Sequence, residues 1–270
     1  MKNIIIFFDI DGTLIDCSKG ITKPTDKTVY TLKEMRDSGA MLFITSGRPY
    51  CLINKEIREL DFDGYITSNG MCILMEGKVI NSKIIGGYII KKLISLSNEY
   101  NFGYHFETPT SLYTSSNNRK FINDYFIRYS LPLSIQNENF EEISKIVNKI
   151  SVYLKKDEDI KIISKELNML TFHKVEDCVY EACYDYISKG SAIKEVIEIL
   201  DIKDWEMYAF GDGTNDIEMM QIVENSIAMG NCHPQLLKYA KYQTASVDKE
   251  GIYEFWKAHN HQEKLDSDVV

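Results

Sequence analysis

Two aspartates, Asp9 and Asp11, follow a run of apolar residues, Ile4–Phe8, and are followed in turn by Gly12. A short apolar run that ends in a turn residue is typical of a buried strand. The glycine favours a sharp turn directly after the aspartates. Two carboxylates at the end of a buried strand repel each other and lose hydration, so few folds tolerate them without a cation. We therefore expect this pair to lie at a cation site.

Three further polar clusters follow apolar runs or begin helices, at residues 45–47, 189–190 and 211–216. They read Thr-Ser-Gly, Lys-Gly and Gly-Asp-Gly-Thr-Asn-Asp. In an open parallel sheet, ligands bind beyond the carboxyl ends of the strands. Three of the four clusters sit at such ends, and Lys189 can reach the same crevice from the start of its helix. Their convergence predicts one shared site.

The two acidic clusters each have a simpler interpretation. Asp-x-Asp-Gly also begins calcium-binding loops, but Leu14 and Gly20 stand where such a loop needs glycine and glutamate. Residues 211–216 could form only a turn with a helix cap. They do not form a dinucleotide-binding fingerprint, because Asp216 occupies the position of its third glycine.

The other two clusters also have structural alternatives. Ser46 and Gly47 could simply cap the helix that follows them. A lysine such as Lys189 is, taken alone, more often solvated at the surface. We interpret Arg48 as a structural residue.

The alternation of strands and helices predicts the fold class. We expect an α/β fold with a Rossmann-like parallel sheet and helices on both faces. The predicted strands are residues 4–8, 41–44, 64–67, 207–210 and 226–230, with a hairpin over 72–80. One predicted helix follows Pro24 and has Val29, Leu32 and Met35 on one face. The other predicted helices of this pattern cover residues 52–60, 188–200 and 217–223. We expect the polar end of the chain, from about His261, to fray.

Between residues 84 and 187 the pattern changes to an α+β segment, which we interpret as a domain inserted into the first. The predicted domains are therefore residues 1–83 with 188–270, and residues 84–187. Within the insert we expect helices over 88–100, around 121–126 and over 157–167, and strands over 103–113, 150–154, 169–175 and 178–184. Its aromatic residues Tyr104, Phe106 and Tyr113 favour a core role over substrate contact. The insert offers no obvious catalytic side chain.

The composition limits the possible partners and location. The 270 residues carry a net charge of −9, which argues against nucleic acid or an anionic membrane as the main partner. No apolar run reaches the ~20 residues of a membrane span. The six cysteines form no Cys-x-x-Cys pair, which favours reduced thiols in a cytoplasmic protein.

Together the four clusters resemble the signature motifs of the haloacid dehalogenase-like hydrolase superfamily, a group dominated by magnesium-dependent phosphatases. The long insert and the Ser-Lys-Gly start of the helix after it resemble the Cof-type subfamily with its class IIB cap. We call residues 84–187 the cap. Thr45-Ser46 stands where that subfamily more often has Ala-Thr, and Gly213 stands where serine is common. Both departures keep the hydroxyl or the backbone that the motif needs.

The resemblance implies a role for each motif residue. Asp9 would be the nucleophile that forms an aspartyl-phosphate, and Asp11 would protonate the leaving oxygen and then deprotonate the attacking water. Mg²⁺ would be held by the Asp9 carboxylate, the Asp11 backbone carbonyl and the Asp212 carboxylate. Asp216 would orient Lys189 or a metal-bound water. The phosphoryl oxygens would be held by Ser46, Gly47, Lys189 and Asn215.

The resemblance thus implies a magnesium-dependent phosphatase that acts on a small phosphorylated metabolite, with a sugar phosphate as the favoured substrate. The cap would act as a lid that reads the leaving group. Two alternatives stay open: phosphoryl transfer to an acceptor other than water, as in a mutase, and a non-catalytic phosphometabolite-binding protein. The sequence does not fix the oligomeric state.

Overall fold

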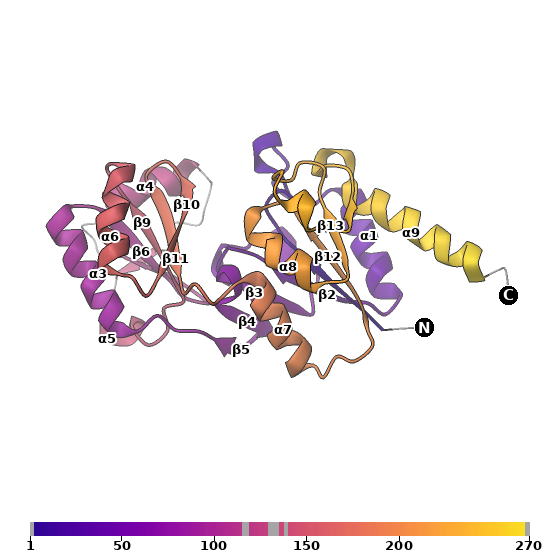
Figure 1. Cartoon of the computed structure of the whole chain (residues 1–270), viewed down its shortest axis with the longest axis horizontal. Helices are drawn as coiled ribbons and strands as arrows, with labels where there is room; N and C mark the ends of the chain where they lie inside the picture. Colours follow the sequence, from indigo (N-terminus) through magenta and orange to yellow (C-terminus); the bar gives the residue numbers. More distant parts are fainter. Residues whose placement is uncertain (1–2, 115–118, 129–134, 138–139, 268–270) are drawn as a thin grey trace.

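The structure, a computed structural model, describes residues 3–114, 119–128, 135–137 and 140–267. It contains two β-sheets, each with its own helices, which form two lobes side by side (Figure 1). The chain leaves the first sheet after residue 82, builds the second sheet, and returns at residue 189. The predicted fold class, an α/β core with an inserted α+β cap, is confirmed. The domain boundaries that we propose, after residues 83 and 187, fall in the two connections.

The first sheet has eight strands in the order β14-β13-β12-β1-β2-β3-β4-β5. All neighbours from β14 to β3 pair in parallel, whereas β4 and β5 add an antiparallel hairpin at one edge. The strands are β1 (Ile4–Phe8), β2 (Met41–Thr45), β3 (Gly64–Thr67), β4 (Cys72–Met75), β5 (Lys78–Ser82), β12 (Glu206–Gly211), β13 (Asn225–Ala228) and β14 (Tyr242–Gln243). The central strand β1 carries Asp9 at its carboxyl end.

The two faces of this sheet are covered by different helices, because the side chains of β1 alternate between them. Ile6 and Phe8 belong to the apolar cluster under α1 and α9, and Ile5 and Phe7 to the cluster under α7 and α8. The helices are α1 (Asp26–Asp37), α2 (Lys55–Arg58), α7 (Lys189–Ile199), α8 (Ile217–Ile222) and α9 (Gly251–Ser267). Burial on both faces explains why β1 is apolar throughout.

The second sheet has six strands in the order β10-β11-β9-β6-β7-β8, antiparallel except for the β7–β8 pair. Its strands are β6 (Gly103–Glu107), β7 (Leu112–Thr114), β8 (Ile135–Asn137), β9 (Lys149–Tyr153), β10 (Thr171–Glu176) and β11 (Val179–Cys183). Its helices are α3 (Gly87–Tyr100), α4 (Arg119–Arg128), α5 (Phe140–Ile143) and α6 (Ile160–Glu166). Apolar residues of α3 and α6 share a core with Tyr104 and Phe106 of β6.

Some predicted elements differ from the observed ones. Residues 103–113 form two strands rather than one, because a turn that contains Pro109 separates β6 from β7. The predicted helix over residues 52–60 is only the four-residue α2, since Ile53 and Asn54 are extended. Val29, placed on the buried face of α1, is 37% exposed. Helix α9 continues to Ser267 instead of fraying from His261.

Among the described residues, no helix combines the length and the apolar character that crossing a bilayer requires. All six cysteines have free thiols.

Candidate active site

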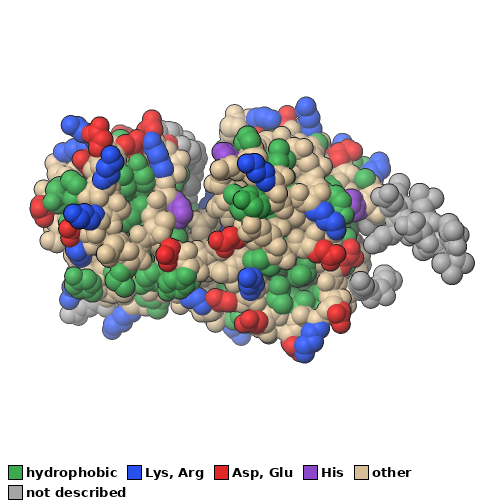
Figure 2. All heavy atoms as spheres, viewed as in Figure 1, with side chains coloured by type: hydrophobic (Ala, Val, Ile, Leu, Met, Phe, Trp, Pro, Cys, Tyr) green, Lys and Arg blue, Asp and Glu red, His purple; other side chains and the backbone are tan. Residues whose placement is uncertain are grey.

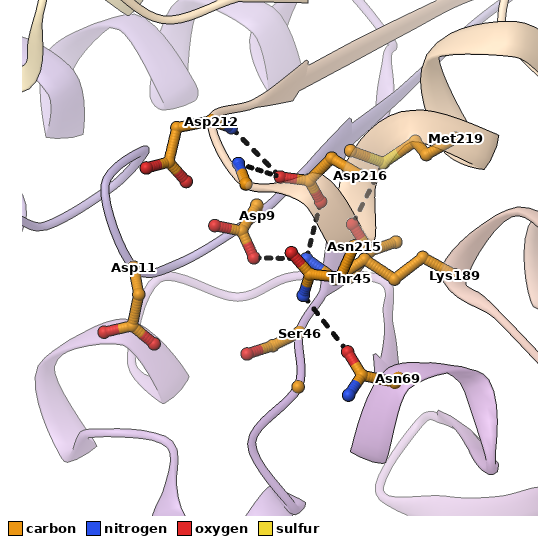
Figure 3. A network of polar contacts seen from close by, with 12 residues as sticks. Asp9, Asp11, Thr45, Ser46, Asn69, Lys189, Asp212, Asn215, Asp216 and Met219 are labelled. Atoms are coloured by element: carbon orange, nitrogen blue, oxygen red, sulfur yellow. Dashed lines mark hydrogen bonds and ion pairs between the residues drawn. The ribbon is translucent and has the colours of Figure 1, made fainter. Parts of the chain in front are cut away.

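Asp9 lies at the centre of the site, where β1 ends between β2 and β12 (Figure 3). Its Oδ1 accepts a hydrogen bond from Lys189 Nζ at 2.5 Å. The same Nζ lies 2.6 Å from Oδ1 of Asp216. Lys189 and Asp216 are completely buried, so this lysine is not the solvated surface residue of the alternative interpretation. The structure therefore joins three of the four sequence clusters through one ammonium group.

The start of α7 fixes the position of Lys189. Ser188 caps the helix: its Oγ accepts from the Ser191 amide at 3.0 Å, and Ser191 Oγ accepts from the Ser188 amide at 2.9 Å. This reciprocal arrangement satisfies two of the free amide groups at a helix start. The following residue, Lys189, then points from the first helical turn toward the strand ends (Figure 3).

The site holds more carboxylates than cations. Burial raises the pKa of Asp9 well above its ordinary value, although Lys189 opposes the shift. Burial also raises the pKa of Asp212 to about 7, with Asp216 adding to the effect. For Lys189, burial alone would lower the pKa, but Asp216 and Asp9 outweigh it and raise the pKa. A lone ammonium thus leaves the carboxylates under-compensated, as the sequence predicts for a cation site.

Asp9, Asp212 and Asp216 each offer a carboxylate oxygen, and the three oxygens lie within 4.8 Å of one another. Asp216 is already engaged: Oδ1 accepts from Lys189, and Oδ2 accepts from the amides of Asp212 at 3.0 Å and Gly213 at 2.9 Å. Asp9 and Asp212 therefore keep free oxygen lone pairs, and a hard divalent cation fits this donor set. Asp216 thus contacts Lys189, one of the two groups that we expect it to orient.

Gly12 lets the turn after β1 approach Asp212 closely. Its φ is +82°, and a Cβ at this position would lie 2.0 Å from Asp212 Oδ2. Only glycine suits both the left-handed backbone and the space. Asn231 Nδ2 donates to the Gly12 carbonyl at 2.8 Å and so ties this turn to the segment after β13. The glycine after the two aspartates is thus a packing requirement of the carboxylate cluster.

Asp11 is held by Arg48, which we had interpreted as structural. Arg48 Nη2 and Nε donate to Asp11 Oδ1 and Oδ2 at 2.6 and 2.8 Å, a bidentate pair. The Asp11 side chain is 53% exposed and lines the cavity, as does Arg48. Arg48 is therefore more than a structural residue. Its position directly after Ser46 and Gly47 in the sequence could have indicated a place at the cavity.

The predicted phosphate-binding residues border the same cavity. Ser46 is buried after β2, and its Oγ accepts from the Arg48 amide at 3.1 Å, which leaves the hydroxyl hydrogen free to donate. Asn215 Nδ2 donates to Asn69 Oδ1 at 3.1 Å (Figure 3). Asn69 also stands 3.1 Å from where a Gly47 Cβ would lie, so a side chain at Gly47 would crowd it. Asn69 belongs to none of the four sequence clusters.

The two lobes enclose a cavity of about 760 Å³, and the space-filling view is hollowed between them (Figure 2). The core lobe contributes Asp9, Asp11, Ser46, Gly47, Lys189, Asp212 and Asn215. The cap contributes His105, Glu107, Lys149, Ser151, Tyr153 and Glu181. Tyr104 and Phe106 are buried in the cap core as predicted, and Tyr113 packs partly against it. The cap thus adds charged and polar side chains to the cavity, none of which belongs to the four sequence clusters.

Comparisons with known proteins identify the family. Residues 6–256 match the haloacid dehalogenase-like hydrolases. The chain belongs to this family. This match confirms the resemblance inferred from the four clusters.

Relatives of this hydrolase match along nearly the whole chain. The Bacillus subtilis protein YkrA, whose name as a phosphatase is provisional, is 29% identical over 93% of this chain and 96% of its own. A second B. subtilis protein, the 5-amino-6-(5-phospho-D-ribitylamino)uracil phosphatase YitU, is 23% identical over 95% of this chain and 97% of its own.

Two solved structures share the fold of this hydrolase. A hypothetical protein from Geobacillus kaustophilus superposes with a TM-score of 0.85 at 26% identity, over 95% of this chain and 98% of that one. The subclass IIB sugar phosphatase BT4131 superposes with a TM-score of 0.79 at 26% identity, with the same coverage. These relatives bear out the prediction of a phosphoric monoester hydrolase.

Proposed function

We propose that this hydrolase is a magnesium-dependent phosphatase that cleaves a small phosphorylated metabolite, favouring a sugar phosphate, through an aspartyl-phosphate. The observation that carries the proposal is the position of Asp9, a buried carboxylate at the cavity wall between Lys189 and Asp212. The name of the sugar phosphatase BT4131 supports the substrate class.

In the proposed reaction, a carboxylate oxygen of Asp9 attacks phosphorus, and the bond from phosphorus to the ester oxygen breaks. Asp11 gives its proton to the departing oxygen. It then takes a proton from the water that attacks the aspartyl-phosphate, so that inorganic phosphate and free Asp9 result. Once Asp11 has given up its proton, Arg48 holds the resulting carboxylate in the cavity for the second transfer.

The phosphoryl oxygens would be held by donors that already face the cavity. The Ser46 hydroxyl, the Gly47 amide, Lys189 and the Asn215 amide group are those we assign. The Asp9 and Asp212 carboxylates and the Asp11 carbonyl would hold Mg²⁺. When bound, Mg²⁺ would offset the repulsion between Asp9 and a dianionic phosphate.

An Asp9→Asn variant tests the proposal. Its kcat should fall more than about a thousandfold, since the nucleophile is lost, while Lys189 keeps Asp216 as a partner and the fold persists. The matched control is Asp201→Asn, a surface carboxylate that pairs only with Lys203 among its described ion pairs. Circular dichroism and release of phosphate from an aryl phosphate with Mg²⁺ are the measurements. Full activity in the Asp9 variant would overturn the mechanism, and a rearranged ester in place of inorganic phosphate would indicate a mutase.

We also place the protein in the cytoplasm. The six free thiols support that location, since disulfides are rare there.

A further inference from the structure

The cap turns a polar face of its sheet toward the cavity. On three adjacent strands every second side chain lines the cavity: His105 and Glu107 on β6, Lys149, Ser151 and Tyr153 on β9, and Val179, Glu181 and Cys183 on β11. The residues between them point the other way, into the apolar core of the cap. Alternation along a strand therefore separates the cap core from a second wall of the active-site cavity.

This polar wall carries more negative than positive charge. Lys149 Nζ lies 3.1 Å from Glu107 and 2.9 Å from Glu181, so one ammonium serves two carboxylates. Lys149 and Glu107 are almost completely buried. Lys174, another cation that lines the cavity, is already paired with Asp157 at 2.6 Å and Asp177 at 2.8 Å.

His105 makes two further contacts on this wall. Its Nε2 lies 3.2 Å from Glu107 Oε1, and its Nδ1 lies 3.0 Å from the Tyr153 hydroxyl. A neutral imidazole satisfies both contacts, with Nε2–H donating to the carboxylate and Nδ1 accepting from the hydroxyl. In that arrangement the wall keeps one net negative charge.

The two oxygens of Glu107 have different partners. Oε1 of Glu107 accepts from Ser151 Oγ at 2.8 Å and contacts His105. Oε2 is buried, and although it lies near Lys149 Nζ it accepts no hydrogen bond of good geometry from the described residues. Buried carboxylate oxygens are normally hydrogen-bonded. Glu107 Oε2 is thus held by the charge of Lys149, whereas the Glu181 side chain is 25% exposed and is the carboxylate on this wall that a ligand hydroxyl or ammonium can reach.

We propose that Glu107 and Glu181 select the leaving group: they favour one that brings hydrogen-bond donors to the cap and disfavour one that brings a second negative charge. The inference rests on the proposed phosphatase function, because the group in question is the alcohol of the phosphate ester. Like charges brought together in a buried site oppose binding, which makes such a wall a filter as well as a contact surface. Hydroxyl and ammonium groups can both donate hydrogen bonds to these carboxylates, so a leaving group with either is favoured.

The test compares matched linear substrates at pH 8, with Mg²⁺: sorbitol 6-phosphate, its 1-amino-1-deoxy analogue, and gluconate 6-phosphate. They differ only at C1, which is a hydroxymethyl group, a protonated aminomethyl group or a carboxylate. We expect kcat/KM for the carboxylate to be at least about tenfold below that for the polyol. Glu107→Gln and Glu181→Gln should each narrow this ratio severalfold. Glu158→Gln, which removes an exposed cap carboxylate outside the cavity, should leave it unchanged.

The possible results distinguish a failure of the phosphatase proposal from a failure of the proposed filter alone. No Mg²⁺-dependent hydrolysis of any ester, including an aryl phosphate, contradicts the phosphatase itself. Hydrolysis with equal kcat/KM for polyol and carboxylate, or a ratio that neither glutamine variant narrows, contradicts the filter alone. If Glu107→Gln does not fold, the filter is tested by the kcat/KM ratio of the wild type and by Glu181→Gln, because Glu181 is less buried. The amine and polyol arms show which donor the wall prefers.

Discussion

Lys149 of the cap donates a hydrogen bond from Nζ to the Gly47 carbonyl of the core lobe at 2.6 Å. Gly47 belongs to the loop after β2 that we assign to phosphate binding, and Lys149 begins β9 at the opposite wall of the cavity. The same ammonium also pairs with both Glu107 and Glu181. One side chain thus joins the wall that we assign to the leaving group with the loop that we assign to the phosphate.

Replacing this lysine should destabilise the protein. Lys149→Met leaves buried carboxylates without a cation, which typically costs about 3–5 kcal/mol in the free energy of unfolding. Urea denaturation measures the loss. The double variant Lys149→Met with Glu107→Gln is the control, because removing one stranded carboxylate should restore part of the stability. Equal stability of wild type and the single variant would contradict the role we give to Lys149.

Loss of Arg48 should affect poor leaving groups most. Arg48→Ala removes the two charge-assisted hydrogen bonds that hold Asp11. We expect kcat/KM for an alkyl phosphate to fall roughly tenfold, a moderate effect because the Asp11 carboxylate is half exposed. An aryl phosphate, whose leaving group needs less protonation, should be affected less. Asp11→Asn should show the same difference between the two esters more strongly. An equal loss of kcat/KM for both esters in Arg48→Ala would contradict a role for Arg48 in proton transfer.

Divalent metal should stabilise the folded protein. At a concentration one hundred times its dissociation constant, Mg²⁺ should add about 2.7 kcal/mol to the free energy of unfolding. Asp212→Asn should abolish this increase, because it removes a carboxylate with free lone pairs from the cluster. Thermal unfolding with Mg²⁺ and with a chelator measures the effect, and Asp201→Asn should respond like wild type. A variant at Asp212 that is still stabilised by Mg²⁺ would place the metal elsewhere.

The buried pair in the cap should make stability depend on acid pH. Burial alone would raise the pKa of Glu107, but Lys149, His105 and Ser151 outweigh it and lower the pKa to about 2 from an ordinary 4.5. Because the unfolded chain then binds the proton more tightly, the stabilising contribution is present above pH 4.5 and is lost as pH falls toward 2.

Glu107→Gln should therefore flatten the dependence of unfolding free energy on pH between 5 and 3, measured in urea. Glu181→Gln is the matched control. Burial raises the pKa of Glu181, so that its contribution has the opposite sign. A slope in the Glu107 variant as steep as that of wild type would show that this carboxylate is not the group responsible.

Much of the core lobe could be predicted from the sequence. Apolar runs such as Ile4–Phe8 are buried on both faces of a parallel sheet, and parallel strands present their carboxyl ends at one edge. This rule brings Asp9, Ser46 and Asp212 to one cavity, as the structure shows. The aromatic character of Tyr104 and Phe106 also predicted their place in the cap core.

The tertiary structure alone decided what faces the polar side of the cap sheet. Alternation along β6 and β9 shows that His105, Glu107 and Lys149 share a face, but a polar face is equally compatible with solvent. Only the packing of the cap against the core lobe turns that face into a cavity wall. The contacts of Arg48 with Asp11 and of Lys149 with Gly47 join residues 37 and 102 positions apart in the chain. Local periodicity determines which side chains point the same way, whereas long-range packing determines what they meet.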